Sequence, residues 1–428
     1  MDQVREAAIK AKEASYRLAT LTLEDRNLAL DKISLTLAAR SEDILAANSR
    51  DMEAARAGGL SQVLIKRLRY DRSKLEESLE SIRSLQSQEE VVGKLISRTE
   101  LDGGLILDKV SCPIGVIGVV FEAQPEALVQ ISCLCLRSGN AVLLKGGTEA
   151  RETNEALADA IADALSSDDQ LRDAVQLLST REQFRELLKH DDLIDLIIPR
   201  GSNELVRSIK ESTKIPVLGH AAGICHTYVD KEADIDMAVK VCHDAKVQYP
   251  AVCNAMETLL VHRSIAGDFL PHMAEDYAHA GVELRGDAGV REIIDVREAS
   301  NEDWETEYND LILSIKIVDS LREAIDHINR YSSHHTDAII TSDERAAQMF
   351  MDMVDSSSVM WNASTRFSDG YRYGLGAEVG ISTNKTHARG PVGLEGLSIY
   401  KYRLFGAGHV VADYSGENAR RFTHRKML

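Results

Sequence analysis

The sequence predicts an α/β protein with two α/β domains and a β arm, on the basis of three observations. Apolar strand-like runs alternate with helical spacing over residues 114–230, and a second alternation begins after Cys253. The tail over residues 396–415 alternates polar and apolar side chains, as an exposed strand does. A chain of 428 residues is also too long for one hydrophobic core, so more than one domain is expected.

The first hundred residues are expected to be helical and to lead into a hairpin. Residues 24–59 carry apolar side chains at helical spacing, and the glycine pair Gly58 and Gly59 ends that pattern. Residues 101–113 then alternate and break, which is typical of a β-hairpin.

The alternation over residues 114–230 predicts a parallel sheet covered by helices on both faces. Ligands of such sheets bind beyond the carboxyl ends of the strands. The expected strands are 114–123, 140–147, 174–179, 194–202 and 215–230, with helices at 126–139, 153–165, 181–190 and 203–213.

The second series predicts another α/β unit followed by the arm. An exposed arm has unpaired strand edges, which a partner subunit is able to cover, so a homo-oligomer is expected. The strands of this series are expected at 257–265, 310–320, 335–343 and 357–364, with helices at 321–332 and 344–354.

Composition and charge exclude several classes of function. The chain has 50 Lys and Arg against 68 Asp and Glu, a formal charge of −18, which disfavours nucleic-acid binding but leaves room for one positive pocket. No uncharged apolar run reaches the roughly 18 residues that a membrane span needs. The charged N-terminus lacks the apolar core of a secretion signal, so a cytoplasmic location is expected.

The six cysteines are expected to be free thiols, and no metal site is expected. They form no CxxC pair, and a long chain that looks cytosolic does not need a disulfide framework. Cys225-His226 and Cys242-His243 are adjacent pairs, and neighbours in a strand point to opposite faces, so neither pair is a natural chelate.

Two strand ends run into glycines that open helices, namely Lys145-Gly146-Gly147 and Arg200-Gly201-Ser202. Free N–H groups at a helix start attract phosphate, and the two cations add positive charge there. Either turn alone is more simply an ordinary strand–helix connection. Two of them in one sheet favour a nucleotide, although neither is a GxGxxG motif or a P-loop.

A polar cluster follows an apolar strand at Asn362, Ser364, Thr365 and Arg366. An arginine grips a carboxylate with two parallel hydrogen bonds, so the cluster suits a substrate carboxylate. A solvated loop explains the same pattern equally well. On pattern alone, Glu307 is more simply a surface residue.

Cys253 lies in "QYPAVCNAMETLL", between a proline-anchored approach and an apolar run. The segment resembles a loop that enters one helical turn, whose N–H groups would favour a reactive thiolate. No base is adjacent in sequence, so a nucleophile and a buried thiol are equally consistent with the residues. The other five cysteines lie in apolar segments and are expected to be buried.

Several longer segments, in order along residues 5–410, carry a resemblance to a known family. They include "GVIGVVFEAQPEALV", "SGNAVLLKGG", "IPRGSNELV", "YPAVCNAMETLLVH" and "SSSVMWNASTRFSDGYRYGLGAEVGISTNKTHARGPVGLEGL". These segments resemble the γ-glutamyl phosphate reductases, a branch of the aldehyde dehydrogenase superfamily. The resemblance implies an aldehyde-dehydrogenase-like fold with a Rossmann-type cofactor domain, an α/β catalytic domain and a β oligomerisation arm.

The resemblance implies the reduction of L-glutamyl 5-phosphate by NADPH to L-glutamate 5-semialdehyde and phosphate, the second step of proline synthesis from glutamate. Cys253 matches the family's nucleophile, which forms a thioester that is then reduced. Val217 replaces the glutamate with which hydrolytic members of the superfamily activate water, and a reductase needs no such base.

The same resemblance assigns the cofactor residues. Lys145, Gly146 and Gly147 match the segment at the adenosine ribose, and Thr148 replaces an acid that NAD-specific members carry, which favours NADP. Gly201 and Ser202 match the turn at the pyrophosphate, and Glu307 matches the acid at the nicotinamide ribose.

For the substrate, Asn362, Ser364, Thr365 and Arg366 match the segment that shapes the binding end, and Arg366 is assigned to the α-carboxylate. Residues 1–102 and 114–245 are expected to form the dinucleotide-binding domain, residues 246–390 the catalytic domain, and residues 103–113 and 391–428 the arm.

A dimer or tetramer is expected, and a transient contact with a separate glutamate 5-kinase is a hypothesis, because this chain has no kinase-like region. The alternatives are another NAD(P)-dependent aldehyde dehydrogenase, an acyl-CoA reductase, or a non-catalytic protein on the same scaffold.

Overall fold

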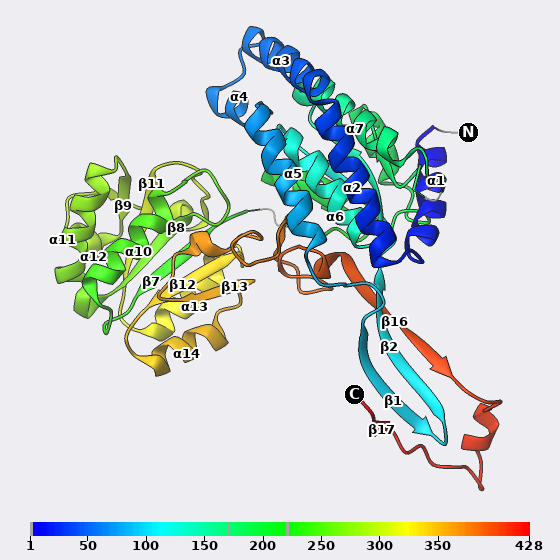
Figure 1. Cartoon of the computed structure of the whole chain (residues 1–428). Helices are drawn as coiled ribbons and strands as arrows, with labels where there is room; N and C mark the ends of the chain where they lie inside the picture. The colour runs from blue at the N-terminus through cyan, green and yellow to red at the C-terminus, as the bar shows by residue number, and fades with distance from the viewer. Residues whose placement is uncertain (1–2, 170, 220–221) are drawn as a thin grey trace.

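The computed structural model describes residues 3–169, 171–219 and 222–428, and the side chain of Val63 is not described. Figure 1 shows three parts: a helical lobe around one sheet, a second lobe around another sheet, and a long β arm. The arm projects from the helical lobe, and the chain ends beside β17 on the arm.

The N-terminal helices cover the first lobe. Residues 24–59, expected as one helical stretch, form two helices that are separated at Arg40, whose backbone leaves the helical region at φ −96° and ψ 17°. Both helices pack on α7. These helices are α1 (Gln3–Leu18), α2 (Leu23–Ala39), α3 (Ser41–Ala57), α4 (Gln62–Leu68) and α5 (Arg72–Gln86).

The sheet of the first lobe is parallel, in the order β5-β4-β3-β6 within the described residues. Phe121 of β3 pairs with Arg200 of β6, and Val120 pairs with Lys145 of β4, so the carboxyl ends of these strands meet at one edge. The strands are β3 (Val116–Phe121), β4 (Ala141–Lys145), β5 (Val175–Leu177) and β6 (Leu196–Arg200), and the helices are α6 (Pro125–Arg137), α7 (Arg151–Leu165), α8 (Arg181–Leu187) and α9 (Asn203–Ser212).

The sheet of the second lobe is also parallel, in the order β10-β9-β11-β8-β7-β12-β13 in the part of the chain that is described. Its strands are β7 (Cys225–Val229), β8 (Met256–His262), β9 (Glu283–Gly286), β10 (Arg297–Glu298), β11 (Ile312–Val318), β12 (Thr336–Ile340) and β13 (Ser358–Trp361). Its helices are α10 (Ile235–Val247), α11 (Arg263–His279), α12 (Ala288–Arg291), α13 (Leu321–Tyr331) and α14 (Glu344–Met353).

The arm is an antiparallel sheet in the order β16-β2-β1-β17. Its hairpin turns at Gly103 and Gly104, whose φ angles of 48° and 86° suit glycine. Its strands are β1 (Leu95–Asp102), β2 (Leu105–Pro113), β16 (Ser398–Phe405) and β17 (Arg425–Lys426), and a small ladder of β14 (Ile381–Ser382) and β15 (Gly390–Pro391) precedes β16.

The strand pairings differ from the expected division of the chain in two places. β1 lies within the expected dinucleotide-binding range 1–102 but pairs with β2 in the arm, because a hairpin needs both of its strands. β7 lies within the expected range 114–245 but pairs with β8 and β12 of the second sheet. An apolar strand pattern predicts burial and does not tell which of two sheets buries the strand.

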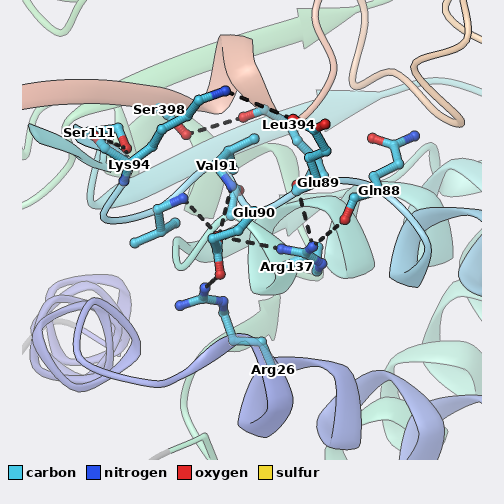
Figure 2. A network of polar contacts seen from close by, with 12 residues as sticks. Arg26, Gln88, Glu89, Glu90, Val91, Lys94, Ser111, Arg137, Leu394 and Ser398 are labelled. Carbon is cyan, nitrogen blue, oxygen red and sulfur yellow. Dashed lines mark hydrogen bonds and ion pairs between the residues drawn. The ribbon is translucent and has the colours of Figure 1, made fainter. Parts of the chain in front are cut away.

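A buried charge cluster holds the root of the arm against the helices (Figure 2). Glu90 accepts a hydrogen bond from Arg26 of α2, and its other oxygen lies 3.5 Å from Nη1 of Arg137 on α6. That oxygen also accepts the N–H groups of Val91 and Val92 at 2.8 and 2.7 Å. Both guanidinium groups are buried, so Glu90 neutralises charges that have little access to water.

Candidate active site

Cys253 lies in the loop between α10 and β8 and is partly exposed. Burial raises the pKa of the thiols of Cys112, Cys133, Cys135, Cys225 and Cys242, so these five are poor nucleophiles at neutral pH. Four of the five are buried as expected, and Cys112 is partly exposed on the arm. Exposure and position therefore single out Cys253.

The Cys253 loop is held from both sides. A side chain on Gly223 would place its Cβ 2.4 Å from the Cα of Cys253, so only glycine fits there. The thiol of Cys225 donates to the Cys253 carbonyl at 3.2 Å, and the amide of Asn254 donates to the Ser368 carbonyl at 2.8 Å. The loop forms one hydrogen-bonded turn, in which the N–H of Ala255 donates to the Val252 carbonyl at 2.9 Å, and it then enters strand β8.

Two arginines supply positive charge near the sulfur. Burial lowers the pKa of both Arg200 and Arg366, and the proximity of Cys253 acts in the opposite direction on each. Arg366 is only 8% exposed, and its Nε donates to Oε1 of Gln248 at 3.0 Å. Two guanidinium groups therefore lie within electrostatic range of Cys253.

The other three residues of the predicted substrate cluster have different surroundings, and Ser364 contacts Arg366 directly. Ser364 accepts the N–H of Arg366 at 3.3 Å and thereby caps the short turn Thr365–Phe367. The amide of Asn362 bonds the N–H and the carbonyl of Thr341, both at 3.0 Å, so its polar atoms are already used by the end of β12. The hydroxyl oxygen of Thr365 is buried without a partner among the described residues.

Lys145 ends β4 at the carboxyl edge of the first sheet and folds back onto the carbonyl of Gly146. Burial, followed by the nearby charge of Arg181, lowers the pKa of Lys145, so two cations share this corner. A Cβ on Gly146 would lie 2.2 Å from Nδ2 of Asn154, and one on Gly147 would lie 2.1 Å from Oε1 of Glu149. A side chain at Gly146 would therefore displace the buried Asn154, while the contact at Gly147 is with the end of a flexible side chain. The two glycines leave the backbone of the turn open to close approach.

The second glycine turn begins α9 at the same edge. Ser202 caps the helix by accepting the N–H of Leu205 at 3.4 Å, and a Cβ on Gly201 would lie 2.7 Å from Oε2 of Glu122. The N–H of Ser202 donates to that same carboxylate oxygen at 3.1 Å. An acid at this helix start shows that the turn accepts an anion.

Glu307 reaches this turn from the second lobe. Its Oε2 accepts a hydrogen bond from Nδ2 of Asn203, the first residue of α9, at 2.8 Å. Two residues further on, the N–H of Asn309 donates to Glu257 at 3.3 Å. Glu257 forms a fully buried ion pair with Lys246 at 2.6 Å, so the Glu307 loop is tied to the helix that precedes Cys253.

Val217 lies beside the first sheet, where it bridges to Ile197, and its carbonyl accepts Nδ2 of Asn384 at 2.7 Å. The position carries no carboxylate that is able to activate water. His220, three residues after Val217, lies outside the described residues.

The structure places Arg366 and Arg200 within electrostatic range of Cys253 and bonds Glu307 to Asn203 at the second glycine turn. The Lys145 turn lies at the same carboxyl edge of the first sheet. Sequence reasoning missed Gly223 and Gln248, together with the Lys246–Glu257 pair, and recorded Arg200 only as a charge at a turn. These residues carry no local pattern, because their roles depend on contacts between distant segments.

Within the described residues, no group of three or more His, Cys, Asp or Glu side chains is suited to hold a metal ion. In the same part of the chain, no helix is long and apolar enough to cross a bilayer.

The parallel sheets, the glycine turns and the loop cysteine define an aldehyde dehydrogenase, and the sequence profile of the aldehyde dehydrogenase family matches residues 1–290. The chain belongs to this family, and it is an oxidoreductase whose class of cofactor is a nicotinamide dinucleotide. Within the family it is similar to γ-glutamyl phosphate reductases. That of Methanosarcina barkeri is 54% identical, with 100% of this chain and 98% of the relative covered. That of Acetivibrio thermocellus is 53% identical, with 99% and 98% covered.

Solved structures agree with this placement. The crystal structure of the γ-glutamyl phosphate reductase from Thermotoga maritima matches with a TM-score of 0.93 at 40% identity, covering 96% of this chain and 100% of that one. Glyceraldehyde-3-phosphate dehydrogenase GapN from Methanocaldococcus jannaschii, complexed with NADP, matches with a TM-score of 0.67 at 17% identity, covering 94% of each chain, and shares the fold. The expected fold class and family are confirmed.

Proposed function

We propose that this chain reduces L-glutamyl 5-phosphate to L-glutamate 5-semialdehyde and phosphate with NADPH, as the second step of proline synthesis from glutamate. One observation carries the proposal. Cys253, in a loop fixed by Gly223 and Asn254, lies within electrostatic range of Arg200 and Arg366. The names of the relatives, which cover the whole chain, supply the substrate and product.

In the proposed mechanism, the Cys253 thiolate attacks the acyl carbonyl, the bond from carbon to the phosphate oxygen breaks, and phosphate leaves with its electron pair. The backbone N–H of Cys253 stabilises the oxyanion that forms. NADPH, when bound, supplies the hydride that reduces the thioester. The hemithioacetal on Cys253 then releases the aldehyde and regenerates the thiolate.

The surroundings of Cys253 suit a reductase better than a hydrolase. Val217 replaces the acid that activates water in hydrolytic members, so the thioester is protected until it is reduced. Arg366 is assigned to the α-carboxylate of the substrate, because a buried guanidinium binds a carboxylate strongly.

The cofactor residues are proposed to act as the family resemblance implies. Gly146, Gly147 and Gly201 offer close backbone approach to the dinucleotide phosphates, and a phosphate that binds at the start of α9 would compete with Glu122 for the N–H of Ser202. Lys145 and Arg181 are two cations that favour the 2′-phosphate of NADP over NAD. Glu307 is assigned to the nicotinamide ribose, and its hydrogen bond to Asn203 supports this assignment.

Substitution of the nucleophile tests the proposal. Cys253→Ser should lower turnover by roughly a thousandfold or more, because an alcohol without a general base is a far weaker nucleophile than a thiolate. The reverse reaction provides the assay, as NADP reduction that requires both glutamate 5-semialdehyde and phosphate. NADPH binding and the melting temperature should not change, and Cys112→Ser, on the arm, should retain activity.

Substantial turnover by Cys253→Ser would contradict the covalent route. A requirement for coenzyme A in place of phosphate would support the alternative of an acyl-CoA reductase. The homo-oligomer, the transient contact with a glutamate 5-kinase and the cytoplasmic location remain predictions. Co-sedimentation of the two purified enzymes at working concentrations tests for a stable complex.

A further inference from the structure

A cavity of about 150 Å³ lies at the carboxyl edge of the first sheet, between α5, the first turns of α6 and the end of β6. Its lining combines both signs of charge with amides. A volume of this size holds roughly five or more water-sized groups, which is the size of the amino-acid end of a small substrate. The charged and amide residues of the lining are Lys74, Glu77, Gln124, Glu126, Gln130 and Arg200.

Two opposite charges in this cavity have atoms without partners. Oε2 of Glu126 and Nη1 of Arg200 are both buried and without a hydrogen-bond partner among the described residues. Burial raises the pKa of Glu126, while Lys74 and Arg200 act in the opposite direction. A buried polar atom without a hydrogen-bond partner costs free energy. In native proteins such an atom calls for a partner, such as a ligand or a water molecule. The cavity is therefore complementary to a ligand that carries both charges.

Arg200 connects this cavity to the nucleophile. It ends β6 opposite Phe121 of β3, directly before the glycine turn at Gly201. Glu126 and Cys253 both act electrostatically on its guanidinium. A substrate whose carbonyl lies at Cys253 can therefore extend towards Glu126. The guanidinium of Arg200 interacts with both ends of this path.

We propose that this cavity receives the amino end of the substrate, with Glu126 accepting the α-ammonium group. The inference rests on the proposed function and names the part of the site that selects an amino acid. The unpaired Nη1 of Arg200 offers the adjoining α-carboxylate a second cation beside Arg366. Glu77 is not the acceptor, because its carboxylate pairs with Lys74 at 2.7 Å.

Selectivity follows from this arrangement. An aldehyde or acyl phosphate without an amino group leaves Glu126 buried and unpaired, so it should react more slowly than the amino acid. Sites built to pair a polar substrate group reject analogues that lack it more strongly than apolar pockets do.

Two aldehydes of equal chain length test the proposal in the reverse reaction with phosphate and NADP. They are glutamate 5-semialdehyde and 5-oxopentanoate, which lacks the amino group. Glu126→Gln should lower the ratio of kcat/KM between the two aldehydes by at least tenfold, mainly through KM, and leave the KM for NADP unchanged. Part of the glutamate 5-semialdehyde is cyclised in solution, and this part is the same in assays of the wild type and of the variant. It therefore cancels when the kcat/KM ratio of the variant is divided by that of the wild type.

Glu77→Gln is the matched control, because it removes a carboxylate from the same lining and should leave the ratio unchanged. Glu126→Asp keeps the charge and should retain more of the preference than Glu126→Gln. An unchanged ratio in both Glu126 variants would overturn the inference. If the wild type fails to oxidise glutamate 5-semialdehyde with phosphate, the proposed function itself fails, which is a different outcome.

Discussion

At Cys253 the neighbouring positive charge comes from Arg200 and Arg366, which approach from different lobes of the molecule. Arg200 ends a strand of the first sheet, and Arg366 lies in the turn that follows β13. Neither residue is near Cys253 in sequence. The reactivity of the thiol therefore depends on the packing of the two lobes as well as on its own loop.

Arg366→Ala should raise the KM for glutamyl 5-phosphate by roughly tenfold to a hundredfold, because a charge-assisted pair with a carboxylate contributes about 1.5–3 kcal/mol. The KM for NADPH should change little. Steady-state kinetics with each substrate varied in turn measures both constants. Equal increases in the two constants would contradict the assignment of Arg366 to the carboxylate.

The Lys246–Glu257 pair gives a stability prediction at the same scale. Both side chains are completely buried, so Lys246→Met should lower the free energy of unfolding by about 3–5 kcal/mol by leaving Glu257 unpaired. Arg83→Met, which removes an exposed partner of Glu80, is the control and should cost less than about 1 kcal/mol. Chemical denaturation measures both variants.

The pH dependence of Lys246→Met provides a second test of the same pair. Burial already raises the pKa of Glu257 to about 7 in the presence of the lysine, and loss of the lysine raises it further. An acid whose pKa is raised by folding destabilises the protein above its unfolded pKa. The stability deficit of Lys246→Met should therefore shrink as the pH falls from 8 to about 7 and level off below, where Glu257 is protonated in the wild type as well. A deficit that is constant between pH 8 and 7 would contradict this account.

At the scale of elements, the strands and helices of both series follow from the sequence because each is a buried apolar run with a clear period. β3, β4, β12 and α13 lie within the expected ranges. Two long helices, α10 and α11, were not predicted, and α11 contains Pro271, which on pattern ends a helix. The lobe to which β7 belongs and the break at Arg40 depend on contacts between segments, which a linear pattern does not contain.

The residues of the candidate site likewise fall into those that the sequence predicted and those that only the fold reveals. Cys253, the glycine turns and the Arg366 segment were found because each is a dense local motif. Gly223 lies thirty residues before Cys253 and has no motif of its own. Its importance arises only where the fold places its backbone against the nucleophile. The cavity residues other than Arg200 are likewise spread over α5 and the start of α6 without a shared pattern.

The charge cluster at the root of the arm should stabilise the packing of α2 and α6 against the segment that leads into the arm. Glu90→Gln removes the negative charge between two buried guanidinium groups, so it should lower the free energy of unfolding by about 3–5 kcal/mol. Glu80→Gln is a surface control and should cost less than about 1 kcal/mol. Similar denaturation midpoints for the two variants would show that Glu90 does not hold this joint.

At the scale of the whole molecule, the arm exposes apolar side chains that a partner subunit is expected to cover. Tyr402 and Leu404 of β16 are 60% and 58% exposed, on a strand whose outer edge is unpaired among the described strands. Replacing both by Asp should dissociate the oligomer, because each apolar side chain that returns to water forfeits roughly 1.5–3 kcal/mol.

Sedimentation velocity measures this effect. The wild type should sediment as a dimer or tetramer and the double variant as a smaller species. Tyr16→Asp, at a residue that is 65% exposed on the helical lobe, should leave the sedimentation coefficient unchanged. A monomeric wild type would contradict the expected homo-oligomer.

The arm and the cofactor edge are connected through one continuous stretch of chain. β2 ends at Pro113, and β3 begins at Val116 and ends at Phe121, beside the Glu122 carboxylate that holds the N–H of Ser202. A partner subunit on the arm and a nucleotide at the Ser202 turn would act at opposite ends of this strand. We therefore expect the strength of subunit pairing and the affinity for cofactor to vary together.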